Sequence, residues 1–391
     1  MYIQRDLAIK LRSLIEKFPV VSLTGPRQSG KSSLLQNEFQ DFGYVNLEDP
    51  DLRQYALSDP KGFIRDNGKR LIIDEAQYAG DLFSYIQLEV DTNETSKYIL
   101  SGSQNFLMNN KINQSLAGRV AITHLLPFSM NEISSSNLSN SDQFATIFNG
   151  FYPRLLTGNI APTNFFPSYI QTYIERDIRT LSNITNLDTF ESFVRLCAGR
   201  TGQIINYTSI SNDLGVSLNT IKNWLSILKT SFIAFELKPY HQNFNKRITK
   251  TGKLYFYDSG LLCSLLGLIS EDQYQSHYLK GGIFENFVIA ECLKQFYHRA
   301  IKPNIYFWQT SNKLEVDLIV EQFQNNRVFE IKSGQTPHKN FGKNLVKWKE
   351  MANVENKNIK VIYGGDTQLT MYGIEYVPWN KINNLFVHEK L

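Results

Sequence analysis

The segment SLTGPRQSGKSS, which runs from Ser22 to Ser33, constrains the fold of this chain more than any other stretch. Four residues separate Gly25 from the run Gly30-Lys31-Ser32. At this spacing, glycines let backbone N–H groups wrap a phosphate, while the lysine and the hydroxyl reach the outer phosphates and their metal ion. The spacing therefore predicts a phosphate-binding loop.

The flanks of this loop fit the same interpretation. The run VVSLT before it predicts a strand, and KSSLLQNEF after it predicts a helix whose N-terminal amides and positive dipole end would face a bound anion. The alternative is a surface turn that contains two glycines and a lysine. The predicted nucleotide contacts come from Gly25, Pro26, Arg27, Gln28, Ser29, Gly30, Lys31, Ser32 and Ser33.

The segment RLIIDEAQ supplies the acidic groups that hydrolysis of a nucleotide needs. Leu71 to Ile73 predict a buried parallel strand, which would place Asp74 to bind Mg²⁺ through water and Glu75 to polarise the attacking water. We expect Ser32 to share the metal with Asp74. A strand that ends in a helix-capping acid is the plainer alternative. Together with the loop, the acidic pair favours hydrolysis over simple binding.

A third strand and a later arginine complete the predicted nucleotide site. KYILSGSQNF ends in polar residues, of which Ser103 or Gln104 could contact the terminal phosphate or the water. Arg119, in QSLAGRV, cannot lose its proton and could neutralise charge on the transferred phosphoryl group. A polar turn and a solvated arginine are the plainer alternatives.

Together, GPRQSGKSSLL, YVNLEDPDLR, LIIDEAQYAGDLFSYIQ, YILSGSQNFLM and QSLAGRVAITHLLPFSMNEI resemble a large prokaryotic family of AAA-type P-loop ATPases. The resemblance extends over nearly the whole chain. In that family a C-terminal domain of unknown function, related to PD-(D/E)XK nucleases, follows the ATPase domain. The resemblance implies ATP as ligand, with Lys31 and Ser32 at the phosphates and metal. It also implies Asp74 and Glu75 as the Walker B pair and Arg119 as an arginine finger.

Composition limits the remaining interpretations. A chain of 391 residues needs two or three domains, and its 42% hydrophobic and 13% aromatic content indicates a folded protein. The formal net charge of +4 does not by itself predict a nucleic-acid partner. The three cysteines lack the spacing of a metal site or disulfide framework, and the N-terminus lacks the apolar core of a signal peptide. The run GLLCSLLGLI is too short to cross a bilayer and predicts a buried helix. We expect a cytoplasmic protein without a membrane partner.

The middle of the chain predicts a winged-helix module. YTSISNDLGVSLNTIKNWLSILK indicates two helices joined at LGVS, with Ser217 or Asn219 capping the second. The following LKPYHQNFNKRITKTGKLYFYD predicts a β-hairpin with five cations and no acid before Asp258. These cations are Lys238, Lys246, Arg247, Lys250 and Lys253, of which Lys246, Arg247 and Lys250 are the predicted phosphate contacts with DNA. A lid or packing module that never touches DNA is equally open.

The C-terminal third predicts a site with carboxylates and a lysine. NKLEVDLIVEQFQNNRVFEIKSG indicates a hairpin turned at QNN, with Asp317 in its first strand. Glu330 and Lys332 share one face of its second strand, because side chains two residues apart point the same way. Two carboxylates can bind a divalent metal, and the lysine can orient or deprotonate water. With Glu285 in the helix-like GGIFENFVIAECLKQ, the set resembles the PD-(D/E)XK core, although no proline precedes Asp317. An exposed hairpin with solvated charges is the alternative.

The sequence thus predicts an α/β protein in three parts. These are an AAA-type P-loop ATPase domain with a helical lid at 1–200, a winged-helix domain at 201–260, and a restriction-endonuclease-like α/β domain at 261–391. ATP and Mg²⁺ are the predicted cofactors, and a second divalent metal is a candidate for the C-terminal domain. Three functions stay open: an ATPase, an ATP-gated metal-dependent DNA nuclease, and a nucleotide-switched scaffold. Candidate partners are double- or single-stranded DNA, another copy of the chain, and an unknown protein.

Overall fold

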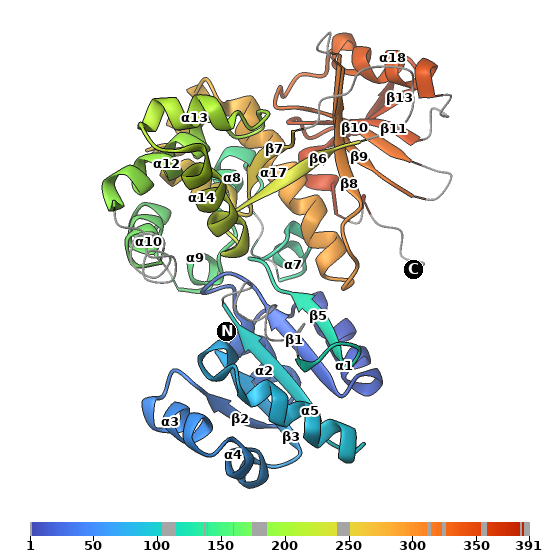
Figure 1. Cartoon of the computed structure of the whole chain (residues 1–391). Helices are drawn as coiled ribbons and strands as arrows, with labels where there is room; N and C mark the ends of the chain where they lie inside the picture. Colours follow the sequence, from blue (N-terminus) through green and yellow to red (C-terminus); the bar gives the residue numbers. More distant parts are fainter. Residues whose placement is uncertain are drawn as a thin grey trace. The chain divides into compact units, whose positions relative to one another are not determined.

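The computed structural model describes residues 2–103, 115–136, 138, 140–158, 160–173, 186–240, 251–310, 314–322, 326–352, 358–383 and 385–386. The chain forms two compact units, and Figure 1 labels their helices and strands. Unit 1 comprises Met1–Phe128, Thr230–Phe232 and Phe296–Ile301, and unit 2 comprises Ser129–Lys229, Ile233–Gln295 and Lys302–Leu391. The predicted boundaries after residues 200 and 260 stay predictions.

Unit 1 alternates strands and helices. Its helices are α1 (Leu7–Lys17), α2 (Lys31–Glu38), α3 (Pro50–Ser58), α4 (Pro60–Asn67), the 3-10 helix η1 (Ala76–Ala79) and α5 (Leu82–Thr92). Its strands are β1 (Val20–Thr24), β2 (Gly43–Asn46), β3 (Arg70–Asp74), β4 (Lys97–Gly102) and β5 (Val120–His124). Asp49 and Asp59 define where α3 and α4 begin, because each accepts backbone N–H bonds from the first turn and precedes a proline.

The five strands of unit 1 form a parallel sheet in the order β2-β3-β4-β1-β5. Successive strand residues alternate between two apolar clusters: Leu71 and Ile73 belong to one, and Ile72 to the other. Both faces of the sheet are therefore covered, as a parallel sheet requires. The strands predicted at VVSLT, LII and KYILSG and the helix after the glycine loop are confirmed.

The first part of unit 2 is helical. The helices of the unit are α7 (Met130–Ser135), α8 (Gln143–Asn149), α9 (Pro153–Thr157), α10 (Pro162–Tyr169), α12 (Leu187–Gly199), α13 (Tyr207–Leu214), α14 (Leu218–Thr230), α15 (Ser259–Leu265), α16 (Glu271–Ser276), α17 (Lys280–Tyr297) and α18 (Lys343–Ala352), with 3-10 helices η3 (Lys339–Gly342) and η5 (Trp379–Lys381). Gly215, with φ 65°, ends α13, and the Ser217 hydroxyl accepts the Thr220 N–H at 3.1 Å to begin α14. The two helices predicted around LGVS are confirmed, and so is the buried helix predicted at GLLCSLLGLI.

The strands of unit 2 form a mixed sheet in the order β12-β13-β11-β10-β9-β8-β6-β7. They are β6 (Ala234–Pro239), β7 (Lys253–Phe256), β8 (Ile305–Gln309), β9 (Glu315–Val320), β10 (Arg327–Lys332), β11 (Ile359–Tyr363), β12 (Leu369–Met371) and β13 (Ile374–Pro378). The two strands predicted as a hairpin, β9 and β10, pair antiparallel, and most of the turn predicted between them lies outside the described residues. β6 pairs antiparallel with β7 and parallel with β8, so the strands predicted as a wing belong to the same sheet as the C-terminal strands.

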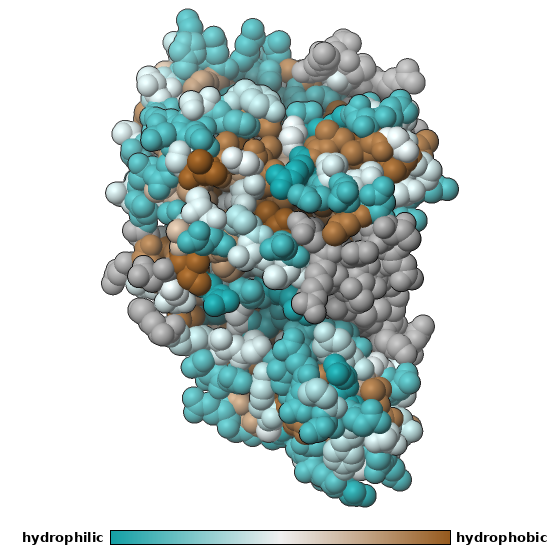
Figure 2. Space-filling view, turned by 90° about the vertical axis from the view of Figure 1, so that its left-hand side faces the viewer, coloured by the Kyte–Doolittle hydropathy of each residue, from teal (hydrophilic) through white to brown (hydrophobic). Residues whose placement is uncertain are grey.

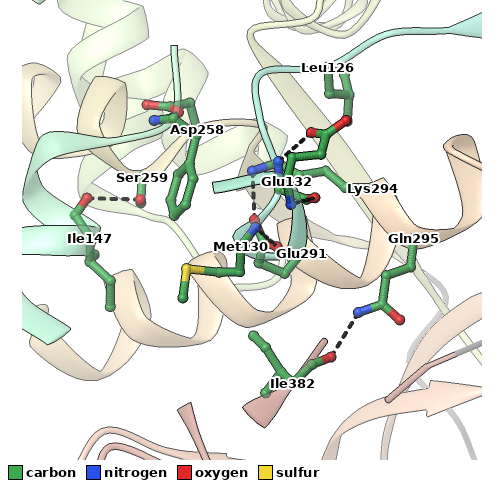
Figure 3. Close-up of polar contacts among 12 residues, drawn as sticks. Leu126, Met130, Glu132, Ile147, Asp258, Ser259, Glu291, Lys294, Gln295 and Ile382 are labelled. Atoms are coloured by element: carbon green, nitrogen blue, oxygen red, sulfur yellow. Dashed lines mark hydrogen bonds and ion pairs between the residues drawn. The ribbon is translucent and has the colours of Figure 1, made fainter. Parts of the chain in front are cut away.

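Asp258 at the start of α15 and Glu291 and Lys294 on α17, which Figure 3 shows as sticks, are buried within unit 2. The Glu291 carboxylate accepts the Met130 N–H at 2.9 Å and lies 2.7 Å from the Lys294 ammonium. That ammonium also lies 4.1 Å from the ring centre of Phe151, whose N–H donates to Asp258 at 2.8 Å. Each of these buried charges therefore has a partner. Removing Glu291 or Lys294 would leave the other charge buried and uncompensated.

The surface shown in Figure 2 is mostly hydrophilic, with several hydrophobic patches between hydrophilic residues. Isolated hydrophobic surface residues are normal in folded proteins, so hydropathy alone does not locate a site. Among the described residues, no helix combines the length and the apolar character that a membrane span requires. The cytoplasmic location stays a prediction.

Candidate functional site

The glycine loop of unit 1 follows β1 at the carboxyl edge of the parallel sheet, and its tight path depends on two glycines. A Cβ on Gly25 would lie 2.1 Å from the carbonyl oxygen of Leu125, so no larger residue fits without displacing the backbone. Gly30 has φ 92°, a left-handed conformation that favours glycine, and it immediately precedes α2. Gln28 also has a positive φ of 61°. The loop therefore turns its backbone sharply before the helix.

Arg5 holds the glycine loop in place through hydrogen bonds, although no sequence pattern predicted this role. Its guanidinium is buried and donates to the carbonyl oxygens of Ser29 at 2.8 Å and Leu126 at 2.7 Å. It also lies 4.5 Å from the ring centre of Phe128. Because Arg5 links the loop to the segment after β5, it fixes the loop before any ligand binds. A lone arginine near the start of a chain carries no signal of such a role.

Lys31 lies inside the loop, only 5% exposed. Its ammonium donates to the carbonyl oxygens of Gly25 and Pro26, each at 3.0 Å. Burial lowers the pKa of Lys31, an effect that the nearby carboxylates of Glu75 and Asp74 oppose. A buried ammonium that has only carbonyl acceptors gains strongly from an anion, so the position suits a phosphate group.

Ser32 and Asp74 meet across the sheet edge. The Ser32 hydroxyl donates to Oδ2 of Asp74 at 2.5 Å, and the Tyr44 hydroxyl donates to the same oxygen at 2.7 Å. Burial, together with the bond to Asp74, raises the pKa of Tyr44. Tyr44 is a site residue that sequence reasoning missed, because a tyrosine in a strand resembles any half-buried strand residue.

Glu75 follows β3 in a left-handed conformation, with φ 51° and ψ 42°. This conformation is unfavourable for a residue other than glycine and is typical of functional sites. It directs the carboxylate to the Ser103 hydroxyl, which donates to Oε2 at 3.1 Å, and to the side-chain amide of Gln77. The structure thus brings Glu75 and Ser103 together, and it adds Gln77, which sequence reasoning missed.

Arg119 lies at the amino ends of the parallel strands, whereas the glycine loop lies at their carboxyl ends. Its carbonyl oxygen accepts the N–H of Val20, the first residue of β1, at 3.3 Å. The loop leaves β1 after its fifth residue, and five strand residues span about 16 Å. The guanidinium pairs with Asp91 through two contacts of 2.5 and 2.8 Å. Within this chain, Arg119 is not brought to the glycine loop.

The other predicted residues are placed as follows. Ser33 belongs to the first turn of α2, and Arg27 and Ser29 belong to the loop. Gln104 and the predicted DNA contacts Lys246, Arg247 and Lys250 lie outside the described residues. Lys253, the last of the five predicted wing cations, is instead 3% exposed and ion-paired, so it offers no surface charge to DNA.

In unit 2 the predicted carboxylates and lysine converge. Asp317 on β9 and Glu330 on β10 lie 3.5 and 2.7 Å from the ammonium of Lys332. Asp317 also accepts the N–H of Ile331 at 2.7 Å, which fixes its carboxylate beside β10. Carboxylate oxygens of Glu285 on α17, Glu315 and Asp317 all lie within 4.8 Å of one another. We call Glu285, Glu315, Asp317 and Glu330 the acidic cluster.

Lys253 and Glu315 are members of this site that sequence reasoning missed. The Lys253 ammonium lies 3.2 Å from Oε1 of Glu285 and also contacts Glu315. The Tyr255 hydroxyl donates to Glu285 as well. Lys253 and Tyr255 share one face of β7, two residues apart, and this spacing is the only signal that could have joined them. Nothing in the sequence placed β7 next to α17.

Burial controls the charges in the acidic cluster. Glu330 is 2% exposed, and burial together with the neighbouring charge of Asp317 raises its pKa to about 8. Burial opposes the charge on Lys332, but the carboxylates of Asp317 and Glu330 outweigh it and raise the pKa of Lys332. Among the described residues, none provides a hydrogen-bond partner for Oε2 of Glu330. An oxygen left in this way suits a cation ligand.

Comparison with known families agrees with the geometry of unit 1. Residues 17–134 match the model of an AAA domain, whereas 140–272 and 280–382 match two models described as domains of unknown function, DUF8612 and DUF4143. A parallel sheet with a glycine loop after β1 and an acidic pair after β3 is the architecture of P-loop ATPases. The N-terminal part of the chain therefore matches an AAA domain and has the architecture of a P-loop ATPase domain.

Curated relatives that match most of the chain are described as uncharacterized proteins. An uncharacterized protein of Mycobacterium tuberculosis is 29% identical over 340 residues, which cover 85% of this chain and 75% of that protein. An uncharacterized protein of Haemophilus influenzae is 20% identical and covers 70% of this chain and 74% of its own length. Among solved structures, a Walker-type ATPase of Pyrococcus abyssi has a TM-score of 0.48 at 16% identity, covering 68% of this chain and 96% of its own. AMPPCP-bound DnaA of Aquifex aeolicus has a TM-score of 0.31 at 12% identity, with coverages of 58% and 89%.

Proposed function

We propose that this protein binds ATP and hydrolyses it with Mg²⁺. The observation that carries the proposal is the contact between Ser32 and Asp74, which joins the end of the glycine loop to the end of β3. P-loop ATPases use a hydroxyl and a carboxylate in these places for the metal. The match of residues 17–134 to an AAA domain supports the same function.

The residues present fit the nucleotide. Backbone N–H groups of the loop and of the first turn of α2 would hold the phosphates, together with the dipole of the helix. Lys31 would exchange the carbonyl oxygens of Gly25 and Pro26 for phosphate oxygens, which compensate the buried ammonium better. The strained turn at Glu75 would position its carboxylate to accept the proton of the water that attacks the terminal phosphorus.

The residues present also fit the metal ion. Mg²⁺ prefers hard oxygen ligands, and the Ser32 hydroxyl and the Asp74 carboxylate are already within hydrogen-bond distance of each other. When bound, the ion would neutralise charge on the phosphates. Ser103 and Gln77 hold the Glu75 carboxylate, and Tyr44 holds that of Asp74. The reaction would release ADP and inorganic phosphate.

Two variants test this proposal on the purified chain. Lys31→Ala should lose ATP binding in isothermal titration, because no other side chain of the loop supplies a buried cation. Glu75→Gln should keep ATP binding and lose hydrolysis by a factor of about 10² or more. The exposed Lys61→Ala in α4 is the matched control and should behave as the unaltered chain. Unchanged hydrolysis in Lys31→Ala or Glu75→Gln would reject the proposal.

The second candidate function, assigned to unit 2, is metal-dependent cleavage of phosphodiester bonds in a nucleic acid. It is favoured by the convergence of Glu285, Asp317 and Glu330 with Lys332, as in a PD-(D/E)XK-like domain. A divalent metal would bind the carboxylates, and Lys332 would orient or deprotonate the attacking water. The helix pair α13–α14 and the antiparallel β6–β7 support a winged-helix module before this domain.

Cleavage is tested with labelled single- and double-stranded DNA, in Mg²⁺ or Mn²⁺, with and without ATP. Asp317→Asn should abolish any cleavage without changing ATP hydrolysis. Activity that persists in Asp317→Asn would come from another site or a contaminant. Intact DNA under every condition would reject this second function and leave the ATPase proposal unaffected.

A further inference from the structure

A groove of about 360 Å³ runs along α18 in unit 2, beside the turn between β12 and β13. Val346 and Met371 contribute apolar surface, and Tyr372 contributes an aromatic ring. Lys339, Lys343 and Lys347 supply the charge, and none of the described residues that line the groove is acidic. We call these six residues the lysine groove.

The three lysines are free to meet an anion. All three are exposed, and among the residues that the structure describes none has a carboxylate within ion-pair distance. Lys343 and Lys347 are one turn apart in α18 and lie on the same side of the helix. Like charges at this spacing destabilise a helix by a few tenths of a kcal/mol. The spacing therefore costs stability unless a negative ligand lies across it.

Tyr372 is held in an unusual conformation at the edge of the groove. It is 79% exposed and has φ 51°, and Gly373 after it has φ 75°. Two successive positive φ values define the tight turn of a hairpin, in which the first position favours asparagine, aspartate or glycine. A bulky aromatic residue there is strained, and such strain is typical of functional positions.

From these observations we infer that the lysine groove binds a single-stranded polynucleotide. The lysines would contact successive phosphates, and the Tyr372 ring would stack on an unpaired base, which is how proteins hold single strands without reading their sequence. Bases in a duplex are already stacked and paired, so a duplex would not use Tyr372 in this way. An acidic peptide would pair with the lysines but would offer no base to the ring.

Helix α18 lines the lysine groove and also contacts the acidic cluster. Asn344, the residue after Lys343, has its side-chain amide 3.5 Å from Oε1 of Glu330. A strand bound along α18 would thus lie next to the carboxylates of the second candidate function. Binding itself does not depend on cleavage, on a metal or on ATP, so it goes beyond both proposed activities.

The test measures fluorescence anisotropy of the full chain in EDTA without nucleotide. The probes are a labelled oligothymidylate, an oligouridylate, a DNA duplex and a poly-glutamate peptide, each about a dozen units long. The two single-stranded probes distinguish DNA from RNA as the source of the strand. The variants are Lys339→Gln with Lys343→Gln and Lys347→Gln, Tyr372→Asn, and a control with the same charge change at the exposed Lys61, Lys69 and Lys302.

We expect a single-stranded probe to bind more tightly than the duplex and the peptide. The groove triple variant should reduce the slope of log affinity against log salt by about 2, since each phosphate contact contributes roughly 0.7 on single strands. Tyr372→Asn should weaken binding roughly tenfold, a loss within the range of one base stack. It should also raise the melting temperature, because asparagine suits the turn.

Three results would each overturn the inference. One is the absence of binding to both single-stranded probes, and another is tighter binding of the duplex or the peptide. The third is an unchanged salt slope in the groove triple variant, or a slope that the control changes equally. ATP hydrolysis measured on the same preparations separates these outcomes from a failure of the ATPase proposal.

Discussion

The ammonium of Lys253 lies 3.2 Å from Oε1 of Glu285, deep in the acidic cluster of unit 2. The side chain of Lys253 is 4% exposed, and it contacts Glu315 as well. Burial opposes its charge, but Glu285, Tyr255 and Glu315 outweigh burial and raise the pKa of Lys253 well above its usual value. A cation from β7 therefore already neutralises part of the cluster, and any metal would add to it or displace it.

Lys253→Met should destabilise the chain in EDTA. Without the ammonium, Glu285 and Glu315 face each other uncompensated, and breaking a buried pair in this way costs about 3 kcal/mol or more. The value should lie at the low end, because the two carboxylates are 16% and 24% exposed. Urea unfolding measures the loss, and Mn²⁺ should restore part of it.

The matched control is Lys238→Met on the neighbouring strand β6, where the lysine is exposed. It should change the free energy of unfolding by no more than about 0.5 kcal/mol. If Lys253→Met were as stable as Lys238→Met in EDTA, the ammonium would contribute nothing to the cluster.

Glu330 predicts a pH dependence of stability. Its native pKa of about 8 exceeds the usual 4.5, so the native state keeps a proton that the unfolded chain has lost. The stability contributed by this proton is fully present below pH 4.5 and is lost as the pH rises through 8. Between these values, the unfolding free energy in EDTA should fall as the pH rises, by roughly one kcal/mol per pH unit from this group.

Glu330→Gln should remove this fall, so the variant becomes the more stable chain at pH 8. Urea unfolding from pH 5 to 8.5 measures the slope, with the exposed Glu350→Gln in α18 as control. Equal slopes for the unaltered chain and Glu330→Gln would show that Glu330 titrates normally.

Tyr44→Phe should weaken the use of Mg²⁺ in unit 1. The Tyr44 hydroxyl donates to Oδ2 of Asp74 at 2.7 Å, and groups that orient metal ligands in this way typically affect metal affinity 10- to 100-fold. The Mg²⁺ concentration that half-saturates ATP hydrolysis should rise about tenfold. Tyr55→Phe, which removes a hydroxyl bonded to Asp66 on the same unit, should leave it unchanged.

Arg119→Ala should not alter ATP hydrolysis by a single chain. Arg119 lies at the amino edge of the sheet and pairs with Asp91 on the surface, whereas the glycine loop lies at the carboxyl edge. Hydrolysis is measured over a range of protein concentrations, and stability should change little, because an exposed ion pair contributes little to it. A loss of activity that appears only at high concentration would assign Arg119 to a neighbouring copy. A loss at every concentration would contradict the placement of Arg119.

The sequence predicted those helices and strands that depend on interactions between residues close together in the chain. The glycine spacing, the apolar run before Asp74 and the period-2 alternation around Glu330 each depend on neighbouring residues, and the structure has the predicted strands, helix and hairpin. Partners from distant segments were not predictable. Arg5 reaches the loop across 24 positions and Tyr44 reaches Asp74 across 30, and neither contact has a spacing signal.

The same limit explains the error at Lys253. In the sequence, Lys253 looks like the other cations of the predicted wing. The sequence shows the sign of a charge but not whether the side chain is buried. Only the pairing of β6 with β8 brings β7 into the C-terminal sheet, and Lys253 then meets a carboxylate 32 positions away. Long-range strand pairing of this kind is fixed by the whole fold.

Gly25→Ala tests the geometry on which the nucleotide site depends. The added methyl would lie 2.1 Å from the carbonyl oxygen of Leu125, and Leu125 is itself held by a 2.8 Å bond from its N–H to Thr24. The backbone must therefore move, at a cost of about 1–3 kcal/mol, and the loop amides move with it. ATP affinity and stability should fall together in titration and urea unfolding.

The control is Gly199→Ala in α12, where no atom lies within 4 Å of the new methyl. This variant should instead raise stability by about 0.5 kcal/mol and leave ATP affinity unchanged. Equal behaviour of the two variants would show that the close approach at Gly25 does not constrain the loop.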